Sequence, residues 1–249
     1  MKYLIELAYV GTHFAGFQVQ PCKITVQSTL QDAIEAVFGE RLPLKGCSRT
    51  DSGVHARQYF ATFESAKLIP SDRLPLALNA NLPEDISVKS ARIVSDDFHV
   101  RHDVEWKEYE YLLINSRIRD PFLTDRAYQC RIMSKDQIEL MRAASKYLVG
   151  KHDFSSFMAA GSKIADTVRT VKYIEICENC ELISIRIAAD GFLYNMVRSI
   201  VGTLIDVANN RIPLCEMPKI LESCDRSKAG TTAPAAGLYL NRVKFRTIE

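Results

Sequence analysis

The sequence predicts an α+β fold in which most of the sheet is antiparallel. Short β-rich runs outnumber the amphipathic helical segments, and two of the runs flank Glu178-Asn179, which is typical of a hairpin. The 249 residues are 47% hydrophobic and 25% charged, a composition that excludes a collagen-like or disordered chain. No internal repeat and no linker rich in proline or serine interrupts the sequence.

The first part of the chain predicts a strand, a helix and two more strands. Residues 2–10 are apolar and end at a glycine-rich turn, which indicates a strand. Residues 25–38 place apolar side chains on one helical face, and the following Gly39 favours a helix end. The runs 58–64 and 86–94 have the composition of strands. The apolar face of the helix comprises Val26, Leu30, Ala33, Ile34 and Val37.

The second part predicts two helices among further strands. Ser134 and Gln137 have the spacing of a capping box and open a helix that runs to Val149 and is closed by Gly150. Residues 195–208 carry a continuous apolar stripe and predict the second helix. The β-rich runs of this part are 107–114, 171–177, 181–188 and 238–245.

The net charge of +2 is nearly balanced, but it is unevenly distributed. A boundary near residue 105 gives an N-terminal half, residues 1–105, with a net charge of −2 and a C-terminal half, residues 106–249, with +4. A strongly basic chain attracts nucleic acid through its phosphates. A net charge of +2 provides no such attraction, so a basic groove must arise from folding.

The seven cysteines are scattered and odd in number, and Glu6 interrupts the N-terminal apolar run before a signal peptide could form. No uncharged apolar run approaches the roughly 20 residues that span a bilayer. We therefore expect a cytoplasmic protein that does not enter a membrane, with its thiols mostly packed as small apolar groups.

Two spacings invite a metal site and are better explained otherwise. Cys177 and Cys180 lack a second ligand pair and flank the predicted hairpin turn. His99 and His102 would share a face only on a helix, whereas their surroundings are β-rich, so we expect their rings to point apart.

His152, Asp153 and Ser156 supply the residue types of a hydrolytic triad, but neighbours within one turn cannot point at one another as that chemistry requires. We expect Asp153 to cap a short helical turn with Phe154 and Phe157 packed inward.

The segment 46–56 is the most informative one. Its Asp51-Ser52-Gly53 is typical of a turn in which the glycine takes a positive φ. Arg49 stands two residues from Asp51, and an arginine beside a carboxylate favours its anionic form, which a nucleophile needs. Both interpretations, a turn and a catalytic Asp51, stay open on the residues alone.

Two further features stand out. Arg198 lies at the margin of the apolar stripe of helix 195–208, where it either reaches solvent or pairs with an anion such as Asp51. Tyr109 and Tyr111 alternate with charges and share one side of a strand, facing either a core or a cleft. A tyrosine facing a cleft can stack on a base and move a proton.

The chain resembles the TruA family of tRNA pseudouridine synthases in segments that extend over nearly its whole length and follow the family's order. The loop 46–56 resembles the family's signature loop, and the remaining segments complete the set. The similar segments are 11–20, 26–30, 46–56, 98–101, 107–111, 152–157, 167–170, 191–202 and 233–240.

The resemblance implies a role for each site residue. Asp51 is similar to the aspartate that attacks uridine and cleaves its N-glycosidic bond, so that the base rejoins the ribose through C5; whether it adds to base or sugar stays open. Arg49 resembles the arginine that extrudes the base. Tyr109, with Tyr111 in reserve, resembles the tyrosine that stacks on the uracil and helps remove its C5 proton. Arg198 matches the arginine that pairs with the carboxylate, and His55 is assigned to RNA contact.

The resemblance also implies the architecture and partners. We expect a pseudouridine synthase fold of two similar halves around a central cleft, and a cytoplasmic homodimer that binds the tRNA anticodon stem-loop and modifies uridines 38, 39 and 40. It implies no cofactor and no metal. Cys47, Ser48 and Phe17 depart from the family's usual residues, which puts fine substrate preference in doubt but removes no reacting group.

Two other functions compete with this isomerase. One is a tRNA-binding or chaperone protein on the same fold without catalysis, against which the intact Arg49-Thr50-Asp51 loop, Tyr109 and Arg198 argue. The other is a metal-dependent hydrolase using His99 and His102, which chelation would inactivate.

Overall fold

The computed structural model describes residues 1–130, 133–159, 161 and 164–246. The chain forms two compact units, Met1–Glu105 with Tyr239–Glu249, and Trp106–Leu238. Both combine an antiparallel or mixed sheet with helices, so the predicted α+β class is confirmed. The last strand, predicted within the C-terminal half, pairs with the first unit: Tyr239 and Leu240 lie parallel to His55 and Ala56.

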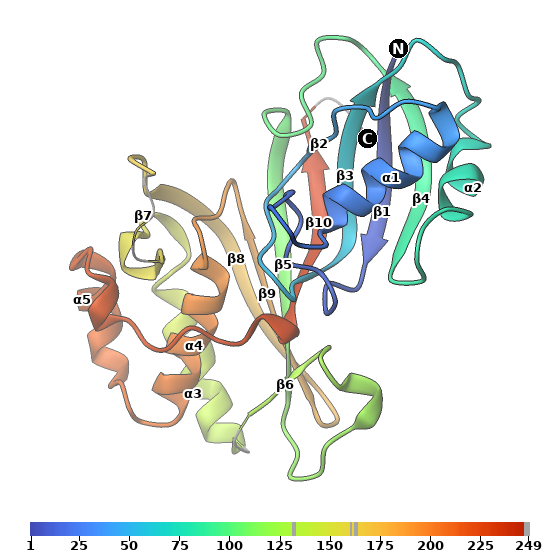
Figure 1. Cartoon of the computed structure of the whole chain (residues 1–249). Coiled ribbons are helices and arrows are strands. Elements are labelled where there is room, and N and C mark those ends of the chain that lie inside the picture. The colour runs from blue at the N-terminus through green and yellow to red at the C-terminus, as the bar shows by residue number, and fades with distance from the viewer. Residues whose placement is uncertain (131–132, 160, 162–163, 247–249) are drawn as a thin grey trace. The chain divides into compact units, whose positions relative to one another are not determined.

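The first unit has the strand order β4-β1-β3-β10, with the short strand β2 also paired to β3. Strand β1 is antiparallel to both β3 and β4. Helices α1 and α2 cover one face of this sheet (Figure 1). The elements are β1 Lys2–Tyr9, α1 Val26–Phe38, β2 Lys45–Gly46, β3 His55–Glu64, α2 Leu74–Asn79, β4 Ile86–Val94 and β10 Leu238–Phe245.

Helix α1 begins and ends as the sequence predicts. The Thr25 side chain accepts from the Ser28 backbone N–H in a capping box, and Gly39 takes the left-handed conformation with φ 83°. Phe38 rather than Val37 completes the buried face, because its ring packs against Tyr3 at 5.9 Å and Phe63 at 5.4 Å between centroids.

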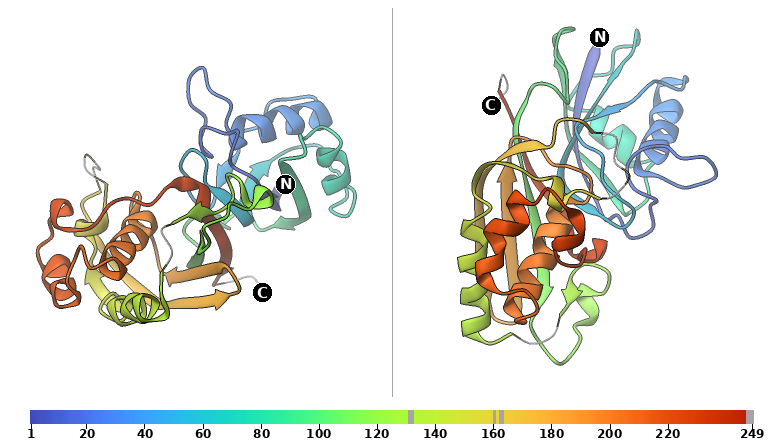
Figure 2. Two further views of the ribbon diagram at one scale, coloured as in Figure 1. Left: turned by 90° about the horizontal axis from the view of Figure 1, so that it is seen from below. Right: turned by 90° about the vertical axis from the view of Figure 1, so that its left-hand side faces the viewer.

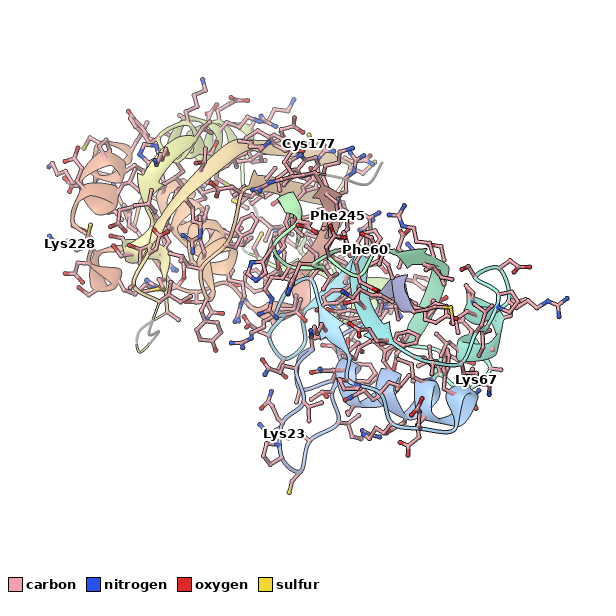
Figure 3. The ribbon with its side chains drawn as sticks, turned by 90° about the horizontal axis from the view of Figure 1, so that it is seen from above. Lys23, Phe60, Lys67, Cys177, Lys228 and Phe245 are labelled. Atoms are coloured by element: carbon pink, nitrogen blue, oxygen red, sulfur yellow. The ribbon has the colours of Figure 1, made fainter. Side chains whose placement is uncertain are left out.

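Aromatic contacts join β10 to the rest of the first unit. Phe245 meets Phe60 of β3 edge to face, with ring centroids 5.0 Å apart (Figure 3), and it also contacts Phe98 at 5.4 Å. Edge-to-face pairs add about 0.5–1.5 kcal/mol beyond the burial of area. These contacts explain why the C-terminal strand belongs to this unit.

The second unit has the strand order β5-β9-β8-β7, in which all neighbours are antiparallel. Strand β6 pairs in parallel with β5. Helices α3 and α4 lie side by side (Figures 1 and 2). The elements are β5 Val104–Ile114, β6 Tyr128–Gln129, α3 Lys135–Lys146, β7 Gly150–Asp153, β8 Val168–Asn179, β9 Leu182–Ala189, α4 Met196–Ala208 and α5 Met217–Glu222.

Two predicted bounds in this unit shift for local reasons. Helix α3 ends at Lys146 rather than 149, because a tight turn follows and Gly150, with φ 112°, already begins β7. The hairpin turn lies at 180–181 rather than 178–179, because Asn179 still pairs with Leu182 and Cys180 takes a positive φ of 54°.

The expectation that most thiols are packed is wrong. Only Cys47 and Cys130 are buried, and burial raises the pKa of the Cys130 thiol to about 11. The exposed thiols are Cys22, Cys177, Cys180, Cys215 and Cys224. Among the described residues, no helix is long and apolar enough to cross a membrane.

Candidate active site

The Asp51 loop, residues 46–56, leads from β2 into β3. The Val54 N–H donates to the Asp51 carbonyl at 3.1 Å, and Gly53 takes φ 78°, as the turn predicts. Arg49 is exposed and Asp51 is half-buried. The loop therefore places Asp51 at the start of the turn and Arg49 two residues before it.

The segment 11–17 packs its backbone directly against this loop. Phe17 N–H donates to the Thr50 carbonyl at 3.1 Å, and Gly53 N–H donates to the Phe14 carbonyl at 3.3 Å. A Cβ added to Gly16, which has φ 87°, would lie 2.6 Å from the Thr50 carbonyl oxygen. Only glycine permits this approach, so the segment fixes the backbone on which Asp51 sits.

His55 is fully buried, with 0% of its surface exposed. Its Nδ1 accepts the Gly11 N–H at 2.9 Å, and its ring stacks on Tyr239 at 4.6 Å. In the neutral imidazole the proton then sits on Nε2. The RNA contact assigned to His55 stays a prediction; in the structure the buried ring binds the backbone of Gly11 next to the Asp51 loop.

The three departures from the family pattern are absorbed by packing. Cys47 is fully buried, and its N–H donates to the Phe60 carbonyl at 2.9 Å. Phe17 stacks on Tyr59 at 4.4 Å, while the Tyr59 hydroxyl donates to the Ser48 carbonyl. Through these contacts the three residues pack the Asp51 loop against β3 and Phe17.

The two tyrosines of β5 have different partners. Tyr111 is fully buried, its hydroxyl donates to the Pro234 carbonyl at 2.7 Å, and burial raises its pKa. Tyr109 is 6% exposed and meets Phe192 edge to face at 4.9 Å. Both belong to the second unit, and the core interpretation fits Tyr111 best.

Arg198 lies on α4 and is half-buried. Its Nε donates to the Ala233 carbonyl at 2.8 Å, and its Nη1 donates to the Asn195 Oδ1 at 2.9 Å. Asn195 precedes the helix with a positive φ of 61°. The guanidinium is thus oriented by two neutral oxygen atoms of its own unit rather than extended freely into solvent.

The His99 and His102 pair, considered above as a metal site, differs from its predicted arrangement. The rings of His99 and His102 lie 4.7 Å apart, so the prediction that they point apart is wrong, because residues 98–103 form a turn rather than an extended strand. Within the part of the chain that the structure describes, no group of three or more His, Cys, Asp or Glu side chains is placed to hold a metal ion.

The capping role predicted for Asp153 is confirmed. Its carboxylate accepts the Ser155 N–H at 2.8 Å, while Phe154 and Phe157 are fully buried. The nearby Ser156 hydroxyl donates to the Ile220 carbonyl at 2.7 Å. These residues build a short helical turn and not a triad.

The described residues group by unit. Arg49, Asp51 and His55 share one loop of the first unit, whereas Tyr109, Tyr111 and Arg198 belong to the second. Gly11 and Gly16 were not predicted to have separate roles, although both lie in the segment 11–20 that resembles the family.

Comparison with known proteins places these observations in a family. Residues 7–103 and 144–246 match the family described as tRNA pseudouridine synthase. The tRNA pseudouridine synthase A of Thermoanaerobacter sp. (strain X514) is 47% identical over 242 residues, which cover 97% of this chain and 98% of that protein.

A second relative and a solved structure are also similar. The tRNA pseudouridine synthase A of Bacillus subtilis (strain 168) is 42% identical over 247 residues, covering 98% of this chain and 99% of that protein. A crystal structure of a Cbf5-Nop10-Gar1 complex matches with a TM-score of 0.38 and 11% identity, covering 95% of this chain and 57% of that one.

Proposed function

The chain belongs to the tRNA pseudouridine synthase family, and we propose that it modifies uridines 38, 39 and 40 of the tRNA anticodon stem-loop with Asp51 as its nucleophile. It is an isomerase that converts uridine in tRNA to pseudouridine. The observation that carries the proposal for Asp51 is its loop, whose backbone is fixed by the segment 11–17.

In the proposed reaction the Asp51 carboxylate adds to the bound uridine and the N-glycosidic bond breaks. The detached uracil turns and forms a bond from C5 to the ribose C1′, while the carboxylate is released. The C5 proton leaves and the released N1 gains a proton, so the product is an isomer of the substrate. A nucleophile fixed before the substrate binds avoids the entropic cost of being positioned during the reaction.

Arg49 is proposed to hold the target base out of the stack. Flipping a base costs a few kcal/mol, and a planar guanidinium can occupy the place that the base leaves. The exposed position of Arg49, two residues from Asp51, suits this role.

The tritium-release assay tests the activity. tRNA carrying tritium at uridine C5 is incubated with the protein, and label released into water is counted. We expect one label to leave for each uridine converted. No release from tRNA that contains uridines at 38, 39 and 40 would refute the proposal.

Tyr109→Phe and Tyr111→Phe are expected to separate catalysis from packing. We expect Tyr109→Phe to lower turnover about 100-fold, since it removes the hydroxyl proposed to assist proton transfer. Tyr111→Phe leaves the Pro234 carbonyl without its donor and should cost about 1–2 kcal/mol of unfolding free energy with turnover nearly unchanged. Single-turnover kinetics and urea unfolding measure the two effects; the opposite pattern would reassign the tyrosines.

Arg198→Ala is expected to reduce turnover about 100-fold, the scale of losing one preorganised electrostatic partner. We propose that Arg198 stabilises the anionic Asp51 carboxylate, so its loss should move the acid limb of the pH–rate profile to higher pH. tRNA affinity should stay within about threefold. Weakened tRNA binding with an unaltered single-turnover rate would assign Arg198 to RNA contact instead.

The proposal extends to the assembly and its location. A homodimer in the cytoplasm, binding tRNA across both subunits, is the expected state. Light scattering of the purified protein gives the mass in solution, and a monomer that retains full activity would contradict the dimer.

The alternative of a tRNA chaperone without catalysis predicts that Asp51→Asn preserves function in cells.

A further inference from the structure

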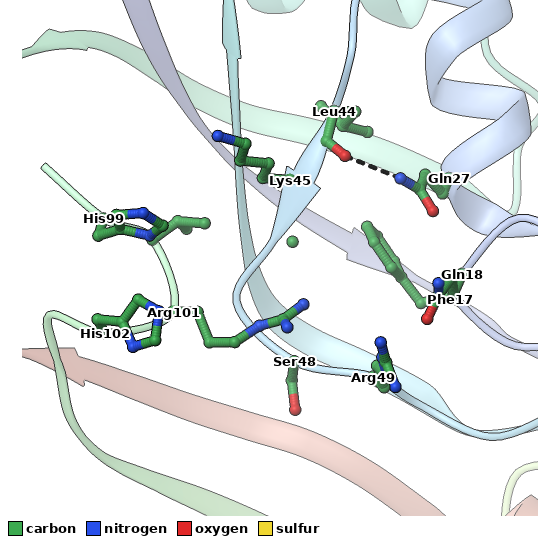
Figure 4. A pocket seen from close by; sticks show the side chains of 12 residues that line it. Phe17, Gln18, Gln27, Leu44, Lys45, Ser48, Arg49, His99, Arg101 and His102 are labelled. Atoms are coloured by element: carbon green, nitrogen blue, oxygen red, sulfur yellow. Dashed lines mark hydrogen bonds between the residues drawn. The ribbon is translucent and has the colours of Figure 1, made fainter. Parts of the chain in front are cut away.

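A pocket of about 210 Å³ opens in the first unit beside the Asp51 loop (Figure 4). Its walls come from β2 and the residues that follow it, from the turn 98–103, and from Phe17, Gln18 and Gln27. It is smaller than the roughly 300–1,000 Å³ of sites that enclose a whole small molecule. A group the size of a phosphate fits this scale better than a nucleoside cofactor.

Positive charge dominates the lining. Lys45, Arg49 and Arg101 are exposed there together with the imidazoles of His99 and His102. No carboxylate belongs to the lining. Lys45, Arg49 and Arg101 also form no ion pair with any carboxylate in the described residues, 1–130, 133–159, 161 and 164–246. Clustered cations without counter-charges attract an anion from solution.

The turn 98–103 presents Arg101 from a fixed backbone. The Asp103 carboxylate accepts the His99 N–H at 2.7 Å, and the Asp103 N–H donates to the His99 carbonyl at 3.0 Å. Phe98 and Val100, the neighbours of His99 in the sequence, are buried. Figure 4 shows the Arg101 side chain reaching from this turn into the pocket, while the nearest carboxylate of the turn is already engaged with backbone.

The opposite wall is also held by hydrogen bonds. Gln27 accepts the Val19 N–H at 2.9 Å and donates to the Leu44 carbonyl at 2.8 Å, so both ends of its amide are used (Figure 4). Phe17 is held by its stack on Tyr59. Hydrogen bonds and ring stacking thus hold this wall, and the three cations of the pocket form no ion pair among the described residues.

We propose that this pocket anchors a phosphodiester of the RNA backbone next to the target nucleotide. The inference rests on the proposed function, because Arg49 belongs both to the pocket and to the Asp51 loop. Phosphate contacts fix the register of a nucleic acid without reading its sequence. An anchor of this kind lets one enzyme place neighbouring uridines by backbone shape.

The salt dependence of tRNA binding tests the anchor, with Arg101→Gln as the variant and Arg73→Gln as the control. Arg73 precedes α2, is exposed and lies outside the pocket lining. Each phosphate contact contributes about 0.7–0.9 to the slope of log K against log salt. From 50 to 200 mM salt, wild type and Arg73→Gln should therefore lose about threefold more affinity than Arg101→Gln.

Neutral linkages locate the contact. Anticodon stem-loops that each carry one methylphosphonate are bound to wild type, to Arg101→Gln and to Lys45→Gln, which substitutes a second pocket cation. We expect one linkage to weaken binding to wild type about threefold and to have little effect on either variant. Equal effects on all three proteins at every linkage would overturn the anchor.

Free phosphate is the other source of this chemistry. Inorganic phosphate is added at constant ionic strength, and we expect it to compete with the stem-loop only weakly. Strong competition that disappears in Arg101→Gln, without any effect of neutral linkages, would assign the pocket to free phosphate and overturn the RNA anchor.

Tritium release in the same proteins separates this inference from the proposed function. Arg101→Gln should raise KM for tRNA with kcat retained. A wild-type protein that releases no tritium but binds tRNA with the Arg101-dependent slope would refute the function and keep the anchor. Full tritium release, with identical slopes and KM in Arg101→Gln and Arg73→Gln, would refute the anchor and keep the proposed function.

Discussion

Asp51→Asn is expected to lower tritium release from tRNA by about a thousandfold or more. The substitution keeps the size of the side chain but replaces the carboxylate that we propose as the nucleophile with an amide, which would leave the covalent step without an attacking group. The measurement is the single-turnover rate with saturating enzyme, which separates chemistry from product release.

The control for this variant is tRNA binding. Asp51 is half-buried, and the turn around it is formed by backbone groups of Asp51 and Val54, so Asp51→Asn should fold as wild type does. Its affinity for tRNA should stay within about threefold, since one charge near the surface contributes little to a backbone-dominated interface. Equal rates in the two proteins would remove Asp51 from catalysis and leave the chaperone alternative.

Gly16→Ala is expected to destabilise the first unit by about 2–4 kcal/mol and to lower turnover of the folded protein about 100-fold. The new methyl group would lie 2.6 Å from the Thr50 carbonyl oxygen and 3.2 Å from the Asp51 carbonyl carbon, and φ 87° adds strain. The loop must move to relieve this contact, and a displacement of about 1 Å at a reacting group costs on this scale.

Gly39→Ala is the matched control. Gly39 has nearly the same φ, 83°, but a Cβ there meets nothing within 4 Å. This variant should cost only about 1 kcal/mol through backbone strain and keep wild-type turnover. Urea unfolding and tritium release measure both variants; equal turnover in Gly16→Ala and Gly39→Ala would show that segment 11–17 does not position Asp51.

Local sequence signals predicted most of the regular elements. The predicted bounds of β4 and β10 agree with the structure, Gly39 ends α1, and the capping box of Ser134 and Gln137 opens α3. Strands β2 and β6, with two residues each, were missed because so short a run carries no periodicity. The six-residue helices α2 and α5 were missed for the same reason.

Contacts between distant parts of the chain account for the features that local sequence did not predict. His55 belongs to the loop of Asp51, but its environment is formed by distant residues. Gly11 lies 44 residues before it, and Tyr239 lies in the last strand, β10. The association of His99 with His102 depends on a turn that Asp103 closes. Neither contact has a signal in local composition.

Charge was also difficult to predict from composition. A net charge of +2 gives no reason to expect nucleic-acid binding, yet folding gathers Lys45, Arg49 and Arg101 around one pocket. Because Lys45 and Arg101 are far apart in the sequence, only the fold reveals that they share a site.

Mapping pseudouridine in tRNA after exposure to the wild-type protein tests the central claim most directly. Unmodified transcripts are treated with the enzyme, derivatised chemically and read by primer extension, with Asp51→Asn as the parallel sample. The account predicts new pseudouridine at positions 38, 39 and 40, wherever the transcript has uridine there, and none with Asp51→Asn. Pseudouridine confined to other positions, or the same pattern with Asp51→Asn, would contradict it.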